Sequence, residues 1–149
     1  WSNFQWLSGK GMDIPAGDPE VTHSYAANPG GLVGFFNENA DGKELTLHSA
    51  NLHMHTLGVS GSVYVERADG TTECLLEMPQ YDFGWQRSYG FMEPVVLKPG
   101  DKLGITCTWD NSPTNQLVVD GVPLEPVDQQ WGEGTSDEMC IAFFYVVAR

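Results

Sequence analysis

The sequence predicts an all-β fold, an antiparallel β-sandwich with jelly-roll-like connections. Three observations support this prediction: short apolar runs are bounded by turn residues, 17 glycines and 9 prolines punctuate the 149 residues, and no long amphipathic stretch of helical period occurs. The length is ordinary for one domain with a sizeable core. We therefore expect residues 1–149 to form a single domain.

The composition excludes two classes of partner. Seven Lys and Arg stand against twenty Asp and Glu, which gives a net charge of −13. Nucleic acid is therefore not an expected partner, because binding a phosphate backbone needs a basic face. No apolar run reaches the roughly 18–20 residues that cross a bilayer, so no membrane span is expected. With 41% hydrophobic residues the chain is expected to fold as a globule.

The first half of the chain alternates between turn signals and strand signals. Residues 1–13 are expected to be irregular, with Trp1, Phe4 and Trp6 as anchors. The turn at 14–18 contains Pro and Gly and leads into the first expected strand. The turn at 68–70, Ala-Asp-Gly, predicts a hairpin. The strands expected in this half are Glu20–Tyr25, Gly31–Phe36, Leu45–Leu57, Ser62–Arg67 and Thr71–Met78.

The second half contains a half-buried strand, a long loop and an apolar run. Lys102–Trp109 alternates apolar and polar residues after a Pro-Gly turn. Asp110–Gly134 is polar and rich in Pro and Gly, which predicts a loop that covers a site or is disordered. Met139–Val147 follows a sequence with the form of a helix capping box. Its nine apolar residues lack a polar helical face, so we predict a buried strand.

Two histidines lie two positions apart in an apolar strand. In such a strand His53 and His55 project to the same side, roughly 6.5–7 Å apart at Cα, and their ring nitrogens could bind one metal ion. The alternative is a pair of hydrogen-bonded histidines on a polar sheet face. A standard cupin site is excluded, because Val59 and Ser60 stand where its Glu would be and no His follows His55.

Two separated segments resemble one enzyme family. His53-Met-His-Thr-Leu-Gly58 and Gly134-Thr-Ser-Asp-Glu-Met-Cys140 resemble the copper type II, ascorbate-dependent monooxygenases, the family of peptidylglycine α-hydroxylating and dopamine β-monooxygenases. The resemblance extends to Ile14-Pro-Ala-Gly and Gly104–Trp109 and covers roughly residues 12–147. It implies the C-terminal catalytic domain of that family.

The resemblance implies a copper site and a disulfide. His53, His55 and Met139 would be the ligands of one catalytic copper ion, and thioether with imidazole suits copper better than zinc. Without the resemblance, core packing would be the ordinary role of Met139. Cys107 would pair with Cys140, which implies an extracytoplasmic location, secreted or periplasmic.

The remaining cysteine and histidines are assigned no role in the site. Cys74 is expected to be a buried thiol, with an intermolecular link as the alternative. His23 and His48 are expected to be structural or exposed, and simple alternation places His48 on the face opposite to His53.

The chain departs from the family at two points. The family's second copper is held by three histidines in a preceding domain, and His23 and His48 cannot supply that site, so the second-copper domain is expected to be absent from residues 1–149. Ile141 and Phe143 replace an Asn and a Tyr that anchor a peptide carboxylate. With Tyr145 they suggest an apolar substrate pocket, and peptidylglycine is not the expected substrate.

Two functions therefore compete. The first is a monooxygenase domain that hydroxylates a C–H bond of a small molecule or peptide with dioxygen and an ascorbate-like reductant. Its electrons would come from a partner domain, a separate protein or a small molecule, and the isolated domain could be inactive or uncoupled. The second is a copper delivery or storage module without turnover. A β-sandwich retained for protein interaction is a third, weaker alternative.

Overall fold

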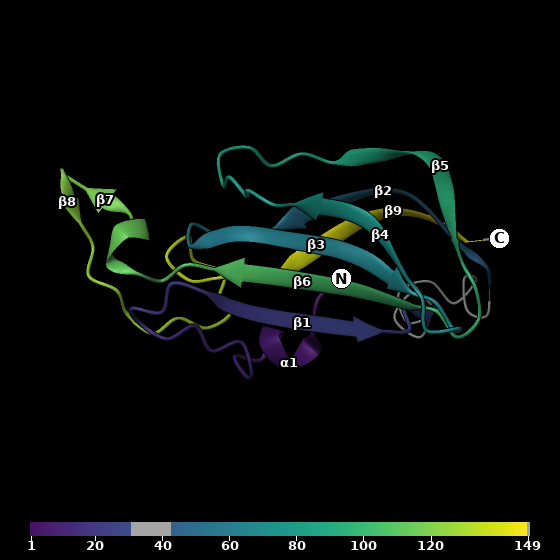
Figure 1. The fold of residues 1–149 in the computed structure, drawn as a ribbon, viewed down its shortest axis with the longest axis horizontal. Helices are drawn as coiled ribbons and strands as arrows, with labels where there is room; N and C mark the ends of the chain where they lie inside the picture. The colour runs from purple at the N-terminus through teal and green to yellow at the C-terminus, as the bar shows by residue number, and fades with distance from the viewer. Residues whose placement is uncertain (31–42, 149) are drawn as a thin grey trace.

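The chain folds as two antiparallel sheets packed face to face (Figure 1). This computed structural model describes residues 1–30 and 43–148. The expected β-sandwich is confirmed, whereas the jelly-roll connections stay a prediction. The expected strand Gly31–Phe36 lies outside the described residues.

The four-stranded sheet has the order β1-β6-β3-β4 and lies in front in Figure 1. β6 is inside this sheet, where it pairs with both β1 and β3. A tight turn at Gly70, whose φ is +88°, joins β3 to β4 as the hairpin that the sequence predicts. The strands are β1 (Val21–Ala27), β3 (Gly58–Glu66), β4 (Thr72–Met78) and β6 (Lys102–Trp109).

The three-stranded sheet has the order β5-β2-β9. β2 is central and pairs with β9 from Leu45↔Ala148 to His53↔Ile141. One extra residue on β2, His48, makes a bulge between Leu47 and Ser49. The strands are β2 (Leu45–His53), β5 (Tyr89–Leu97) and β9 (Ile141–Ala148).

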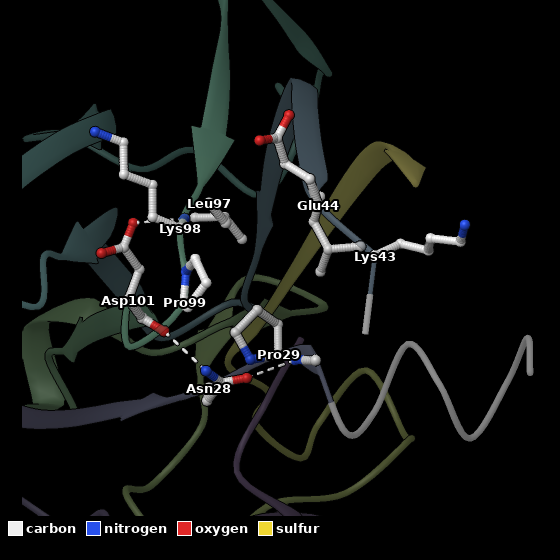
Figure 2. A pocket seen from close by; sticks show the side chains of 10 residues that line it. Asn28, Pro29, Lys43, Glu44, Leu97, Lys98, Pro99 and Asp101 are labelled. Carbon is white, nitrogen blue, oxygen red and sulfur yellow. Dashed lines mark hydrogen bonds between the residues drawn. The ribbon is translucent and has the colours of Figure 1, made fainter. Parts of the chain in front are cut away.

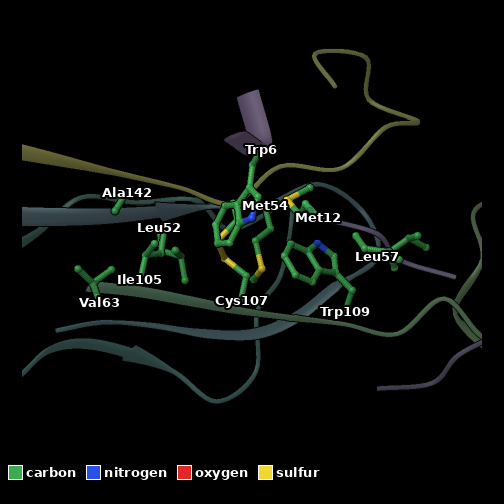
Figure 3. Packing of buried hydrophobic residues seen from close by; sticks show 12 residues of the cluster. Trp6, Met12, Leu52, Met54, Leu57, Val63, Ile105, Cys107, Trp109 and Ala142 are labelled. Atoms are coloured by element: carbon green, nitrogen blue, oxygen red, sulfur yellow. A yellow bond between two sulfur atoms is a disulfide. The ribbon is translucent and has the colours of Figure 1, made fainter. Parts of the chain in front are cut away.

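The core lies between the two sheets, around a disulfide (Figure 3). Cys107 of β6 and Cys140, the residue before β9, are bonded with a Cα–Cα distance of 6.0 Å, so the predicted pair is confirmed. Trp6 is 3% exposed and packs into this core, as expected. Phe4 is 59% exposed and is not an anchor, which corrects the prediction.

Short elements complete the fold. The region 110–134 carries a 3-10 turn and a small hairpin within an otherwise irregular loop, close to the prediction. None of the helices in the described residues is long and apolar enough to cross a membrane. The short elements are α1 (Phe4–Leu7), η2 (Pro113–Asn115), β7 (Val118–Val119) and β8 (Val122–Pro123).

Two expectations need correction, and one strand was not expected. β2 ends at His53 rather than Leu57. β5 was not predicted, because Gly90 and Pro94 interrupt its apolar pattern. Cys74 is exposed rather than buried, because a bulge in the β3–β4 pairing turns Leu75 and its neighbour toward the core and leaves Cys74 on the outer face of an edge strand.

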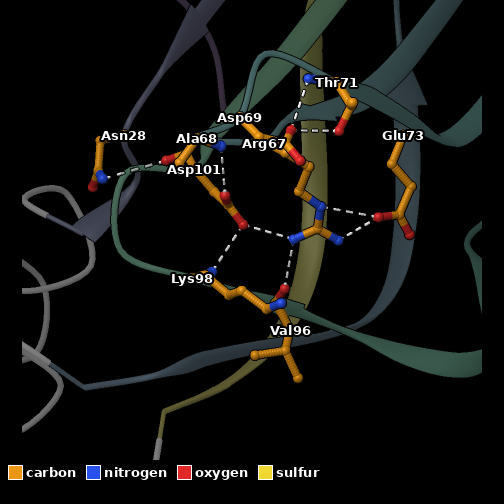
Figure 4. Close-up of polar contacts among 9 residues, drawn as sticks. All are labelled: Asn28, Arg67, Ala68, Asp69, Thr71, Glu73, Val96, Lys98 and Asp101. Carbon is orange, nitrogen blue, oxygen red and sulfur yellow. Dashed lines mark hydrogen bonds and ion pairs between the residues drawn. The ribbon is translucent and has the colours of Figure 1, made fainter.

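The end of the sandwich at the start of β6 is held by a buried ion pair (Figure 4). Asp101 is 2% exposed and accepts hydrogen bonds from Arg67 Nη1 at 2.6 Å, from the Lys98 N–H at 2.9 Å and from the Ala68 N–H at 3.1 Å. The Arg67 guanidinium also pairs with Glu73. Beside this network lies a cavity of about 510 Å³, in which Asn28 donates to the Asp101 carbonyl oxygen (Figure 2).

Candidate functional site

The two predicted ligand histidines lie close together at the C-terminal end of β2. His53 is the last residue of β2, and His55 lies two residues beyond it and is 5% exposed. Their ring centroids are 5.1 Å apart, with the ring planes at 81°. The pair is therefore brought together as predicted, but the reason differs, because regular strand alternation ends at His53. Met54, between them, is fully buried in the core.

The His55 ring is oriented by a backbone carbonyl. Its Nδ1 lies 2.9 Å from the carbonyl oxygen of Asp137. A carbonyl oxygen only accepts hydrogen bonds, so Nδ1 carries the hydrogen and Nε2 keeps its lone pair. In metal-binding histidines, a hydrogen bond from the ring nitrogen that does not bind the metal commonly sets the tautomer. His55 thus presents Nε2 as a potential ligand atom.

The turn before Met139 is tight. The Gly134 N–H donates to Asp137 Oδ2 at 2.9 Å, and the Gly132 N–H donates to the Glu138 carbonyl oxygen at 3.0 Å. A Cβ at Gly132 would lie 2.3 Å from Asp137 Oδ2, so the close approach requires glycine there. This turn directs the Asp137 carbonyl toward His55.

Glu138 is a buried carboxylate that sequence reasoning did not single out. It is 0% exposed. It accepts hydrogen bonds from the N–H groups of Leu57 at 2.7 Å and His55 at 3.1 Å, and from Trp109 Nε1 at 2.8 Å. Burial raises its pKa to about 7, against the lowering effect of these donors. Glu138 thereby ties the turn that carries His55 to β6.

Met139 lies between two fully buried residues, Glu138 and Cys140, and is itself half-buried. The β2–β9 register pairs His53 with Ile141. Continued by two residues past the ends of the strands, this register would set Met139 opposite His55. The contacts of Asp137 and Glu138 with His55 agree with this placement.

The predicted pocket residues lie on the outer face of the three-stranded sheet. Ile141 pairs with His53 and shares its face, since paired residues project to the same side. Phe143 and Tyr145 continue along that face and are 57% and 63% exposed. β9 is thus a strand, as predicted, but it is buried on one face only. The role of these three residues in substrate binding stays a prediction.

The remaining histidines are engaged in aromatic packing. The His48 ring packs against that of Tyr145 in a tilted arrangement with centroids 5.4 Å apart, which places His48 on the same face as His53. The expected opposite face is therefore wrong, because the bulge at His48 shifts the alternation of β2 by one residue. His23 packs edgewise on Trp6, and its Nε2 lies 2.9 Å from the Asp13 carbonyl oxygen.

A loop that sequence reasoning missed contacts both histidines. The side chain of Gln86 hydrogen-bonds to His53 Nδ1. The ring of Phe83 lies edgewise to that of His55, with centroids 6.0 Å apart. These contacts join residues some 30 positions apart, so no local sequence pattern signals them.

The donor set suits copper. In the part of the chain that the structure describes, no three His, Cys, Asp or Glu side chains form a metal-binding group. The candidate set instead combines two adjacent imidazoles with the thioether of Met139, which follows directly after two residues that contact His55. Imidazole with thioether is a donor combination that favours copper over zinc. The buried His55 with an available Nε2 fits such an ion.

Comparisons with known proteins identify the family of this chain. Residues 36–147 match the family model described as copper type II ascorbate-dependent monooxygenase, C-terminal domain. The chain is also 27% identical over 106 residues to DBH-like monooxygenase protein 2 of Mus musculus. That match covers 71% of this chain and 15% of the mouse protein. The chain therefore belongs to the copper type II ascorbate-dependent monooxygenase family, to whose C-terminal domain residues 36–147 correspond.

Proposed function

We propose that the chain binds one copper ion through His53, His55 and Met139 and serves as the hydroxylating domain of a monooxygenase. The observation that carries this proposal is the pairing of the two imidazole rings, 5.1 Å apart, beside the buried segment that contains Met139. A bound copper ion would supply the one-electron redox chemistry by which dioxygen is used to hydroxylate a C–H bond.

The residues around the proposed ligands restrict their movement. The Asp137 carbonyl fixes the His55 ring, and Glu138 holds the backbone of the same turn. The disulfide at Cys140 attaches the segment of Met139 to β6 of the other sheet. Ligands held in this way need little rearrangement when a metal ion binds.

The substrate is proposed to lie along the outer face of the three-stranded sheet. Ile141 is the cross-strand neighbour of His53, and Phe143 and Tyr145 extend an apolar surface away from it. This surface offers one phenol and no cationic group among these three residues, so a small molecule or peptide with an apolar group at the reacting carbon fits it. A peptide bound through its carboxylate does not.

The reaction needs electrons from outside these residues. Hydroxylation with one oxygen atom of dioxygen uses two electrons beyond those of the C–H bond, and one Cu(I) ion provides one. We propose that an ascorbate-like reductant or an electron-donor domain or protein supplies them. The disulfide and the family favour an extracytoplasmic location, secreted or periplasmic.

Copper titration tests the ligand assignment. One copper ion per chain is expected, His53→Ala and His55→Ala should abolish tight binding, and His48→Ala is the matched control that should leave binding unchanged. Met139→Ile should weaken Cu(I) more than Cu(II), and Cu(I) X-ray absorption should detect a sulfur ligand. Two copper ions per chain, or tight binding by the double histidine variant, would contradict the assignment.

A turnover assay distinguishes the monooxygenase hypothesis from that of a copper delivery or storage module. Copper-loaded protein with ascorbate and oxygen should consume oxygen slowly, with little hydroxylation of a glycine-extended peptide. Absence of any oxygen consumption by a chain that binds copper tightly would favour the module without turnover.

A further inference from the structure

One loop contacts all three residues of the His53-Met54-His55 segment. The Tyr81 hydroxyl donates to the Met54 carbonyl oxygen at 2.7 Å and accepts from the Met54 N–H at 3.0 Å. Phe83 and Gln86 contact His55 and His53, as described above. Residues 81–86, which we call the β4–β5 loop, therefore hold this segment from the outside, while the core holds it through Met54.

The loop is closed by its own hydrogen bonds. The Gly84 N–H donates to Asp82 Oδ1 at 2.7 Å, and the Trp85 N–H donates to the Asp82 carbonyl oxygen at 2.9 Å. The turn that carries Phe83 and Gln86 is thus built independently of the histidines. It can impose an orientation on them instead of merely following theirs.

The orientation of the Gln86 amide follows from its second partner. Gln86 Nε2 donates to the carbonyl oxygen of Phe83 at 2.8 Å. The amide oxygen is therefore the atom that faces His53 Nδ1. Because an amide oxygen only accepts, the His53 ring must carry its hydrogen on Nδ1 and leave the lone pair on Nε2.

We propose that Gln86 is a positioning residue that fixes His53 in the tautomer able to bind copper through Nε2. Phe83 holds Gln86 through its carbonyl and limits the rotation of the His55 ring through its own ring. The Asp137 carbonyl independently fixes His55 in the same tautomer. The role of Gln86 toward copper rests on the proposed function, whereas the tautomer of His53 does not.

The tautomer is measured on the metal-free 149-residue chain by long-range ¹⁵N–¹H NMR of the histidine rings, at a pH where both rings are neutral. In the wild type, His53 and His55 should both carry hydrogen on Nδ1. Gln86→Leu should convert His53 to a mixture of tautomers and leave His55 unchanged as an internal reference. Because Gln86 is exposed, this substitution opens no cavity in the core.

Two further variants make the result specific. Gln80→Leu alters an exposed glutamine next to the same loop and should leave both rings as in the wild type. Gln86→Glu keeps an acceptor oxygen and should restore the Nδ1–H tautomer of His53. A wild-type His53 with hydrogen on Nε2, or a tautomer that Gln86→Leu does not change, would overturn the proposal.

Copper binding tests the functional part. Gln86→Leu should lower the Cu(I) affinity about tenfold relative to Gln80→Leu, in the range found when an outer partner of a metal ligand is removed. An equal affinity in the two variants would overturn the positioning role even if the tautomer changes. A wild type that binds no copper would refute the proposed function, while the NMR result would still decide how Gln86 acts on His53.

Discussion

Two buried carboxylates hold opposite ends of the sandwich, and they do so with different partners. Asp101 receives two backbone N–H groups and the Arg67 guanidinium. Glu138 receives two backbone N–H groups and the Trp109 indole. Asp101 joins the start of β6 to the β3–β4 turn, and Glu138 joins the end of β6 to the turn before β3. The geometry is therefore similar, but only Asp101 has a cationic partner among its hydrogen-bond donors.

The two pKa values differ accordingly. Burial alone would raise the pKa of Asp101, but the donors and the positive charge of Arg67 outweigh it and lower the pKa. At Glu138 burial prevails, and the pKa rises to about 7. Neutral donors can thus position a buried carboxylate without fully offsetting its desolvation. In the described part of the chain no cationic side chain donates to Glu138, and this end has a disulfide instead.

The largest expected effect comes from that disulfide. Cys107 and Cys140 are separated by 33 positions, and the loss of such a link is expected to lower the free energy of unfolding by about 4 kcal/mol. Urea unfolding with and without reductant measures this, with Cys74→Ser in both conditions as the control. Copper affinity should fall with reduction, because Met139 adjoins Cys140. Equal stability before and after reduction would show that this end does not depend on the link.

Removal of the cation at the other end should have the next largest effect. Arg67→Met leaves Asp101 buried without its charged partner, which should lower the free energy of unfolding by about 3 kcal/mol. The control is Lys102→Met, which breaks the exposed pair with Glu66 and should change stability by less than about 1 kcal/mol. Similar losses in both variants would mean that Arg67 acts as an ordinary surface charge.

Glu138→Gln tests the carboxylate held by neutral donors. The amide NH₂ would face at least one of the N–H groups that now donate to Glu138, and a buried donor left unpaired destabilises by about 2 kcal/mol. Thermal unfolding at neutral pH measures the change, and Glu133→Gln, at an exposed position of the same segment, is the control. An unchanged melting temperature would indicate that the donors find other partners.

The smallest effect is a difference in pH dependence. The folded-state pKa of Asp101 is lowered, so its contribution is complete above the unfolded-state pKa of about 3.9 and is lost as pH falls through the folded-state pKa. The stability difference between wild type and Asp101→Asn should therefore be larger at pH 6 than at pH 3 in urea unfolding. A difference that is constant or grows toward low pH would contradict the lowered pKa.

The fold was largely predictable because its strands carry local signals. Alternation marked β6, and the turn at 68–70 marked the hairpin of β3 and β4 correctly. β5 was not predicted because Gly90 and Pro94 interrupt its apolar pattern. The predicted face of His48 was wrong because the composition of a strand does not reveal a one-residue bulge.

The candidate site was predictable only in its proposed ligands. His53 and His55 are neighbours in sequence, and resemblance to the family supplied Met139 and the disulfide. The partners of those residues could not be found in this way. Gln86 and Glu138 are ordinary polar residues until the fold brings them to the histidine segment, since their roles depend on contacts between distant positions.

The pairing of β2 with β9 also constrains when the site can form during synthesis. His53 and Met139 are separated by more than half of the chain, and the partner of β2 in this pairing, β9, begins only at Ile141. Contacts of such large sequence separation form late in folding. A nascent chain that has exposed both histidines still lacks Met139 and Cys140, so copper loading at all three ligands and disulfide formation would have to follow translation through Cys140.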